Sequence, residues 1–155
     1  MSEPLPTDHT IPSLQSWLQT QGLNPENLEQ CGSNGDTALM EAVRAGEVEV
    51  VRLLIQAGAI VNARNNDGNN ALWFACFRDR YDLIDLLVKA GIDLNNQNAN
   101  GATALMYAAS AGKTEMVQAL LAAGADVQLE NLDDFRAIDF AANFEILRML
   151  KHVIV

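Results

Sequence analysis

Two short stretches of this sequence hold residues that could bind a phosphate group or a calcium ion. Residues 112–114, Gly-Lys-Thr, have the order that ends a phosphate-binding loop. Asn96, Asn98 and Asn100 alternate as oxygen ligands do at the start of a calcium loop. Tyr107 stands where the first loop needs its opening glycine and where the second needs its bidentate glutamate. We therefore expect an inter-helix turn at the first stretch and tight turns at the asparagines, without a ligand at either.

Histidines and cysteines are too few and too scattered to form a catalytic or metal site. His9 and His152 lie near opposite ends of the chain, so neither has a second histidine with which to form a metal site or a triad. Cys31 and Cys76 lack the spacing of a zinc site or of a disulfide scaffold, and both are predicted to be free thiols, as in a reducing compartment. The sequence thus predicts no catalytic residue, no metal, no cofactor and no enzyme.

The secondary-structure elements that carry these residues belong to a sequence unit that is repeated four times. Gly35, Gly68 and Gly101 follow one another at 33-residue intervals, and Asp134 continues the count. From these four positions the segments GDTALMEA, GNNALWFA, GATALMYA and DFRAIDFA align without a gap. Repetition at this period is typical of a stack, in which each unit buries its apolar face against its neighbours.

Each unit is predicted to hold two short helices. Apolar pairs four residues apart mark one helical face, as in residues 50–51 followed by residues 54–55. A first helix with similar spacing precedes them, and a residue suited to a turn separates the two helices. The separating residues are Gly46, Asp79 and Gly112, and glycines suited to ending the second helix follow at Gly58, Gly91 and Gly124.

These features resemble the ankyrin repeat family, whose unit has this length, opens on G-x-T-P-L-H-x-A and closes on Gly-Ala-Asp-Val-Asn before a β-turn. The resemblance runs from about Cys31 to the C-terminus. It implies an all-α repeat fold, an α-solenoid: an ankyrin repeat stack of helix-turn-helix units joined by β-turn loops, with N- and C-terminal capping repeats.

Two positions of the family pattern are changed in every copy. The proline is replaced by Ala38, Ala71, Ala104 and Ala137, and the histidine by Met40, Trp73, Met106 and Asp139. Thr37 and Thr103 keep the hydroxyl that caps the first helix, and Asn70 is a fitting substitute. Arg136 is not, and the fourth copy has lost most of the pattern, as is expected of a capping repeat.

A single ankyrin repeat domain is predicted over residues 11–155. Its divisions are a truncated N-terminal cap at 11–30, full repeats at 31–64, 65–97 and 98–130, and a C-terminal capping repeat at 131–155. Residues 1–10 hold two prolines and no basic residue, and are expected to be a disordered lead.

Both caps are expected to present an apolar helix face to the stack. In the first, Leu14, Trp17 and Leu18 share one face of a helix predicted over residues 11–21. In the last, the apolar register is expected to continue to the final residue, which predicts a packed C-terminal helix. Glu145 replaces the turn glycine there, so an altered break between the two helices is expected.

The net charge of −10 narrows the choice of partners. Nucleic acid and anionic membranes both demand a basic face, which ten lysines and arginines among twenty carboxylates do not favour. A basic protein segment is the better match, drawn by acids such as Asp36, Glu41 and Asp67, although the acidity could equally serve solubility alone. The opening MSEPLPTDHT lacks the features of a signal peptide, and no apolar run reaches the about 20 residues that span a bilayer. The sequence therefore predicts a cytoplasmic protein without membrane insertion.

In ankyrin stacks the β-turn tips and the exposed side of the first helices form a concave binding face, so the resemblance implies a candidate partner-binding surface. Aromatic side chains with arginine are typical of binding hot spots, and they gather at these places. The candidates on the helices are Trp73, Phe74, Phe77, Arg78, Tyr107 and Phe144, and those at the tips are Asn34, Asp36, Asn66, Asp67, Asn69, Asn100 and Phe135. The alternative is packing between adjacent first helices, to complete the core, for Trp73, Phe74, Tyr107 and Phe140.

The sequence thus predicts a non-catalytic protein–protein interaction module that binds a protein partner on its concave face. An alternative is a regulatory or inhibitory subunit that occludes a site on a partner enzyme or assembly. A monomer is expected, although an exposed aromatic stripe could pair with itself. Asn62 and Asn95 match the repeat-closing asparagine that some ankyrin proteins of animals have hydroxylated.

Overall fold

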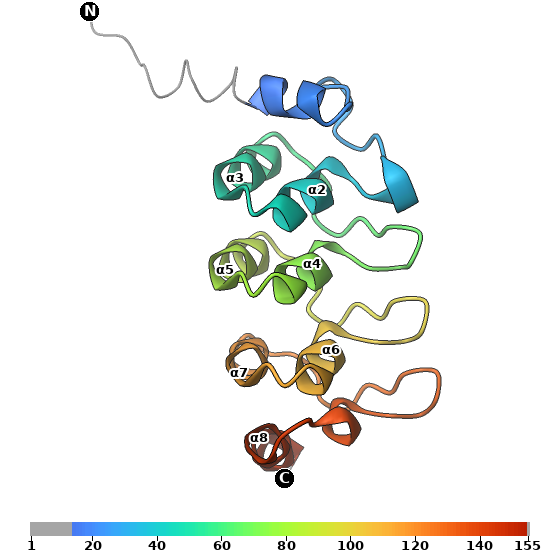
Figure 1. Ribbon diagram of the computed structural model, residues 1–155, viewed down its shortest axis with the longest axis vertical. Helices are drawn as coiled ribbons and strands as arrows, with labels where there is room; N and C mark the ends of the chain where they lie inside the picture. The colour runs from blue at the N-terminus through green and yellow to red at the C-terminus, as the bar shows by residue number, and fades with distance from the viewer. Residues whose placement is uncertain (1–13, 155) are drawn as a thin grey trace, which may run out of the picture.

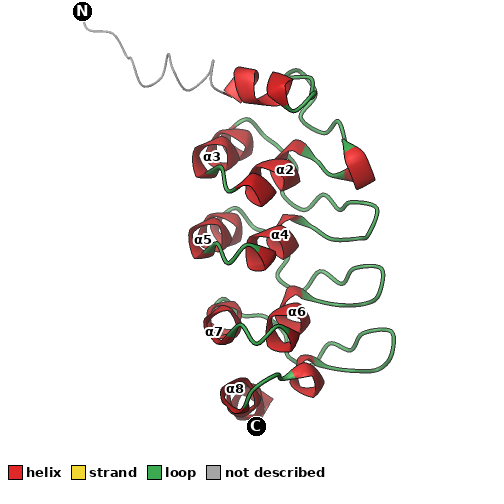
Figure 2. Ribbon diagram, viewed as in Figure 1, coloured by secondary structure: helices red, strands yellow, loops and turns green. Residues whose placement is uncertain are grey.

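The computed structural model describes residues 14–154, which form an elongated stack of helix pairs (Figure 1). One column holds the first helix of each repeat and a second column holds the second helix, while the connecting loops project beyond the first column. Figure 2 shows only helices, loops and turns in this part of the chain. The all-α repeat fold predicted from the sequence is confirmed.

The helices follow the 33-residue period. The first helices of the full repeats are α2 (Ala38–Ala45), α4 (Ala71–Phe77) and α6 (Ala104–Ser110), and the second helices are α3 (Val48–Gln56), α5 (Tyr81–Lys89) and α7 (Thr114–Ala122). The short 3-10 turn η1 (Ser33–Gly35) precedes α2, and the fourth repeat consists of the 3-10 turn η2 (Ala137–Phe140) and α8 (Phe144–Ile154). Residues 14–20 are helical and lie at the opposite end of the stack from α8.

Each first helix of a full repeat begins at the predicted cap. The hydroxyls of Thr37 and Thr103 accept a hydrogen bond from the backbone amide three residues later, at 3.3 and 3.2 Å. The side-chain oxygen of Asn70 accepts one from the amide two residues later, at 3.1 Å. These bonds satisfy amide groups that the first turn of a helix leaves without a partner.

The first helix stops at a residue with left-handed backbone geometry. Gly46 and Gly112 have φ of 74° and 71°, which glycine adopts without steric cost. Asp79 takes the same place with φ of 57°, a conformation that residues with a side chain disfavour. Gly112 and Lys113 thus lie in the inter-helix turn that the sequence predicts, and Thr114 is the first residue of α7.

A basic side chain from the next repeat closes the first helix of the repeat before it. Arg80 donates from Nη1 to the carbonyl of Gly46 at 3.2 Å. Its counterpart one repeat later, Lys113, donates from Nζ to the carbonyls of Cys76 and Phe77 at 3.3 Å each. These cations satisfy carbonyl groups at the end of a helix, where positive charge is also favourable.

The core runs without interruption along the stack. It includes Leu18 at one end, Leu54, Leu87 and Leu120 in the second helices, and Leu150 in α8, each at most 1% exposed. Alanines at the interior positions of the first helices let neighbouring repeats approach closely, since Ala42, Ala75 and Ala108 are fully buried. The apolar faces predicted for the two caps are therefore used for packing.

The loops are joined to one another by a ladder of hydrogen bonds. The amides of Asn66, Ala99 and Leu132 each donate to a carbonyl in the preceding loop, at 2.8, 2.9 and 3.1 Å. Within each loop, an asparagine side chain accepts bonds from the amides two and four residues later; these asparagines are Asn65, Asn98 and Asn131. The asparagines of this region thus form tight turns, as predicted.

The fourth repeat differs from the full repeats in its first helix. Only the 3-10 turn η2 forms, and the side chain of Arg136 does not cap it. Asn143 accepts a bond from the amide of Ile146 at 2.8 Å, so α8 begins just after it. Glu145 therefore lies in the first turn of α8, and the break between the helices is altered as expected.

Two predictions about the ends need comment. Val153 is 48% exposed, so the prediction that the apolar register would remain packed through this position is wrong. The reason is that α8 is covered by a neighbouring repeat on one side only. The predicted lead at residues 1–10 and the predicted start of the first helix at Ile11 lie outside the described residues.

Candidate functional site

Three aromatic side chains form a cluster across α4 and α6. The rings of Trp73 and Tyr107 have centroids 5.1 Å apart, and those of Phe77 and Tyr107 are 6.2 Å apart. We call Trp73, Phe77 and Tyr107 the aromatic cluster. Because the two helices stack in register, side chains one repeat apart in sequence become neighbours on one surface.

Cations lie against the aromatic rings of this region. Arg44 of α2 has its guanidinium carbon 4.5 Å from the centroid of Phe74, and Nζ of Lys113 lies 5.7 Å from the centroid of Tyr107. Each cation is also paired with a carboxylate: Arg44 with Asp36 and Glu41, and Lys113 with Asp79 at 2.7 Å. Burial opposes the charge of Lys113, but the hydrogen bond to Asp79 and the neighbouring negative groups outweigh it, so the pKa of Lys113 is raised.

The exposure of the aromatic residues bears on both expectations for them, contact with a partner and packing between first helices. Phe77 is 56% exposed, whereas Trp73, Phe74 and Tyr107 are each partly buried. Phe74 and Tyr107 pack against the core, so for these two the expectation of packing between first helices is met in part. All four keep some surface in contact with solvent.

A surface pocket of about 270 Å³ lies beside the aromatic cluster. It is lined by Arg44, Trp73, Phe74, Phe77 and Arg78. Arg78 follows α4 directly, is exposed, and forms no salt bridge within residues 14–154. The sequence had pointed to four of these residues as candidates, and the fold adds Arg44, whose place over Phe74 depends on the neighbouring repeat.

The tip residues divide into exposed and buried groups. Four of them are exposed at the loop ends: Asn34, Asn66, Asp67 and Asn100. The side-chain amide of Asn34 donates to the carboxylate of Asp67 at 2.7 Å. Asp36 and Asn69 are only 2% and 8% exposed. Their side-chain oxygens accept bonds from Asn65 and Asn98 of the next loop, at 2.8 and 3.1 Å. Their side chains thus join repeats to one another and are not displayed at the tips.

The last repeat has a separate aromatic group. Phe135 and Phe140 meet edge to face with centroids 5.9 Å apart. Phe144, expected on a first helix, is instead the first residue of α8; it is 71% exposed and has Arg148 5.4 Å from its ring centroid. The expectation that Phe144 lies on a first helix is wrong, because the first helix of this repeat is shortened to η2.

The two asparagines that match the hydroxylated position of some ankyrin proteins make hydrogen bonds between repeats. The side chain of Asn62 accepts a bond from the amide of Asp93 at 2.7 Å and donates to the carbonyl of Gly91 at 3.1 Å. Asn95 accepts one from the amide of Asp126 at 2.8 Å. Both asparagines therefore connect adjacent repeats.

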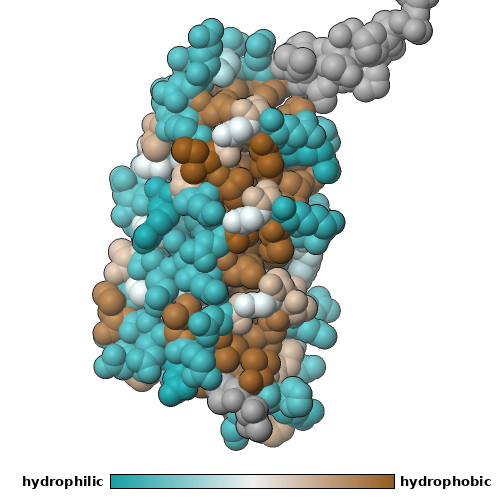
Figure 3. Space-filling view, turned by 180° about the vertical axis from the view of Figure 1, so that it is seen from behind, coloured by the Kyte–Doolittle hydropathy of each residue, from teal (hydrophilic) through white to brown (hydrophobic). Residues whose placement is uncertain are grey.

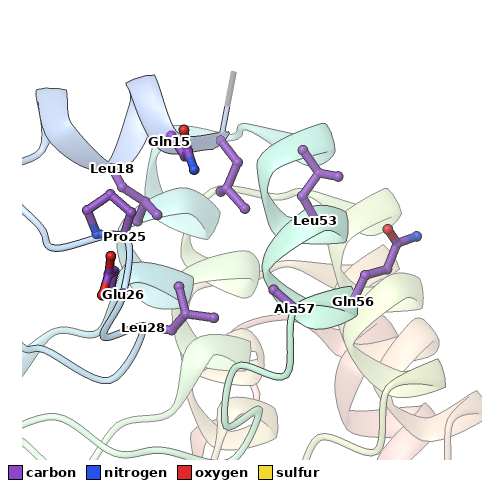
Figure 4. A pocket seen from close by; sticks show the side chains of 9 residues that line it. Gln15, Leu18, Pro25, Glu26, Leu28, Leu53, Gln56 and Ala57 are labelled. Atoms are coloured by element: carbon purple, nitrogen blue, oxygen red, sulfur yellow. The ribbon is translucent and has the colours of Figure 1, made fainter. Parts of the chain in front are cut away.

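Hydrophobic side chains also form a stripe that runs past the individual repeats. Figure 3 shows a stripe of hydrophobic side chains running along the stack on the face turned away from the viewer of Figure 1. A pocket of about 510 Å³ lies between the N-terminal cap and α3 (Figure 4), lined by Leu14, Gln15, Leu18, Pro25, Glu26, Leu28, Leu53, Gln56 and Ala57. Glu26 is the only ionisable side chain among them, which is too little for acid–base catalysis by a pair of groups.

The histidine, cysteine and acidic side chains of residues 14–154 bear on metal binding and on thiol chemistry. No group of three or more histidine, cysteine, aspartate or glutamate side chains in that range could hold a metal ion. Burial raises the pKa of the Cys76 thiol to about 12, so this group stays protonated and is a poor nucleophile. The same range holds no helix with the length and hydropathy to cross a membrane.

Stacked helix pairs with loops on one side define a repeat protein that presents a continuous surface. A family model that describes ankyrin repeats in three copies matches this chain twice, over residues 9–98 and over residues 91–154. The chain belongs to the ankyrin repeat family. Ankyrin repeats are generally protein–protein interaction modules.

Curated relatives match a shorter stretch. Notch-regulated ankyrin repeat-containing proteins of Xenopus tropicalis, Homo sapiens and Mus musculus are each 40% identical to this chain over 55 residues. The match takes in 36% of this chain and 48% of each relative, so the chain spans about half the length of the curated relatives it matches.

Proposed function

We propose that this chain is a non-catalytic module that binds a protein partner on the face formed by its first helices and loop tips. The observation that carries the proposal is the aromatic cluster of Trp73, Phe77 and Tyr107, partly open to solvent beside two arginines. Aromatic residues and arginine are the types most enriched among residues that dominate binding energy. Their position on adjacent repeats offers one partner a continuous contact.

The rigidity of this surface supports tight binding. Trp73, Phe77 and Tyr107 lie on capped helices whose inner faces are buried, so little backbone ordering is left to occur on binding. The rings are also held by one another and, at Tyr107, by Lys113. A surface already ordered in the free protein loses less entropy when the partner arrives.

The tips favour a partner that also carries a basic segment. Asp36 and Glu41 are paired with Arg44, so they are not free to attract one. Asp67 and Asp133 remain exposed and form no salt bridge in the described part of the chain. With a net charge of −10, the chain would attract a basic partner from a distance and hold it at these tips.

A second candidate function is inhibition, in which the same surface occludes a site on a partner enzyme or assembly. The rigid aromatic surface serves both functions equally well. Once a partner is known, adding the chain to it and assaying the partner's own activity separates them. In either case, the free thiols Cys31 and Cys76 support a cytoplasmic setting, and we propose that the chain acts there as a monomer.

Capture of partners with matched variants tests the proposal. Phe77→Ala and Tyr107→Ala should each weaken binding of the captured protein by about 1 to 3 kcal/mol, because they remove contacts at the centre of the surface. Ile60→Ala is the control: Ile60 has the same exposed fraction as Phe77, 56%, but lies outside the aromatic cluster. Circular dichroism should show all three folded, and a partner that binds the four proteins equally would overturn the proposed surface.

A further inference from the structure

The pocket beside the aromatic cluster presents positive charge and no carboxylate. Of its five lining residues, Arg44 and Arg78 are charged and the other three are aromatic. Arg78 pairs with no carboxylate within residues 14–154. Arg44 is paired with Asp36 and Glu41, whose side chains are 3% and 23% exposed, so the free charge at the pocket is that of Arg78. In a chain of net charge −10, this pocket is a local exception.

Cations already lie against two aromatic rings of this region. Arg44 lies over Phe74, one of the three rings that line the pocket, and Lys113 lies over Tyr107 of the aromatic cluster, so these two rings already make the interaction that a partner's lysine or arginine would seek. Such a side chain would also meet the unpaired charge of Arg78. The pocket therefore disfavours a basic residue, although the molecule as a whole favours a basic partner.

We propose that this pocket takes an acidic-apolar segment of the protein partner: an apolar side chain packs against Phe77 and Trp73, and a neighbouring aspartate or glutamate pairs with Arg78. The inference rests on the proposed function and names the partner chemistry at its central contact. An unpaired guanidinium offers a carboxylate two parallel hydrogen bonds, which aromatic neighbours strengthen by excluding water. The partner's basic segment is left to the tips, around Asp67 and Asp133.

The size of the pocket agrees with an amino-acid side chain. Its volume of about 270 Å³ is below the about 300 to 1,000 Å³ of pockets that hold small-molecule ligands. It is open between two repeats and therefore accessible to a side chain from an extended or helical segment.

The local charge can be measured without a partner. Trp17→Phe leaves Trp73 as the single tryptophan, because the chain has two. Quenching of its fluorescence by iodide and by caesium, each normalised to free N-acetyltryptophanamide, reports the charge beside the pocket. We expect iodide to quench more than caesium, and Arg78→Glu in the same background to reverse the order. Stronger quenching by caesium in the Trp17→Phe protein would contradict the inference.

The partner chemistry is tested with a displayed library of random linear peptides selected on the full chain. We expect the enriched peptides to hold an aspartate or glutamate within a few residues of a leucine, isoleucine or aromatic residue. Arg78→Glu should weaken their binding by roughly tenfold or more, the loss of one charge-assisted pair. Arg148→Glu is the matched control, since it makes the same charge change beside Phe144, away from the pocket.

The outcomes separate this inference from the proposed function. Peptides that lose binding on Phe77→Ala but are basic or uncharged would leave the binding surface standing and overturn the acidic contact. Peptides that are indifferent to both Phe77→Ala and Arg78→Glu would count against both. Acidic peptides that bind equally to Arg78→Glu, or a selection without any binder that Arg78→Glu weakens, would also overturn the inference.

Discussion

The junction between the second and third full repeats and the junction between the third and the last repeat are built from the same backbone ladder, but they differ in side chains. At the first, Asn98 donates to Asn69 at 3.1 Å and Lys113 closes α4. At the second, Ala102 stands in the place of Asn69, so Asn131 has no such acceptor. The end of α6 is met instead by a backbone amide, that of Ala142. Gln97 and Asn143 donate across the second junction to the carbonyl of Glu130 and the hydroxyl of Thr114, at 2.8 and 3.0 Å. We infer from the missing asparagine bond and the missing basic side chain that the repeats are held together more firmly in the middle of the stack than at its C-terminal end.

The largest effect on stability should come from removing a core side chain in the middle of the stack or in its last repeat. Leu87→Ala and Leu150→Ala each empty a site with no exposed surface and should cost about 2 to 5 kcal/mol. We expect Leu87→Ala to shift the whole urea-unfolding transition, because it breaks contact with repeats on both sides. Leu150→Ala should instead cause α8 to unfold early and separately from the rest of the stack. Amide hydrogen exchange measures this loss. Identical single transitions for the two variants would argue against the comparison.

A smaller effect should come from the loop asparagines. Asn98→Ala removes two bonds within its loop and one to the preceding repeat, and should destabilise the fold by about 1 to 3 kcal/mol. Asn131→Ala removes the two bonds within its loop only, so its cost in chemical denaturation should be smaller. An equal or larger cost for Asn131→Ala would show that the inter-repeat bond contributes little.

Raising the pH probes the middle of the stack through Cys76. Burial raises the pKa of this thiol from 9.0 to about 12, so its contribution to stability is fully present below pH 9 and is lost as the pH rises above it. In a Cys31→Ser background, the protein should lose about 1.4 kcal/mol more than its Cys76→Ala variant between pH 8 and pH 10. The measurement is urea unfolding at each pH, and parallel pH profiles for the two proteins would contradict it.

The smallest expected effect is an increase in the stability of the C-terminal junction. Ala102→Asn places an acceptor where Asp36 and Asn69 have theirs in the other loops, and Asn131 is positioned to donate to it. We expect a stabilisation of about 0.5 to 1.5 kcal/mol, visible as slower hydrogen exchange in η2 and α8. Ala99→Asn, which adds the same side chain at the exposed tip of the same loop, is the control. If both changes have the same effect, the missing acceptor is not the weakness of this junction.

Most of the fold could be predicted because it depends on nearby residues. Thr37, Asn70 and Thr103 cap helices whose first turns immediately follow them, and the apolar spacing of each helix is a local pattern. The 33-residue register then places equivalent residues in one column. The last repeat was harder to predict because Arg136 offers no side-chain cap to its first helix, while Asn143 provides a cap for α8 a few residues later.

The candidate site could be predicted only in part. Phe77 and Tyr107 follow from their helical positions, and their meeting follows from the repeat spacing. The burial of Asp36 could not be predicted from its own position, since it depends on Arg44 and on Asn65 from the next loop. The expected attraction of a basic segment to Asp36 and Glu41 ignored these pairs, which exist only once the repeats are stacked.

The contacts of Arg80 and Lys113 give synthesis of this chain a direction. The first helices α2 and α4 are each closed by a cation 34 to 37 residues further along, so each is incomplete when it leaves the ribosome, until the next repeat has been synthesised. At about 5 to 20 residues per second, that delay is about 2 to 7 s. A nascent chain should therefore mature one repeat behind its own elongation, and a stalled ribosome would hold a helix with an open end.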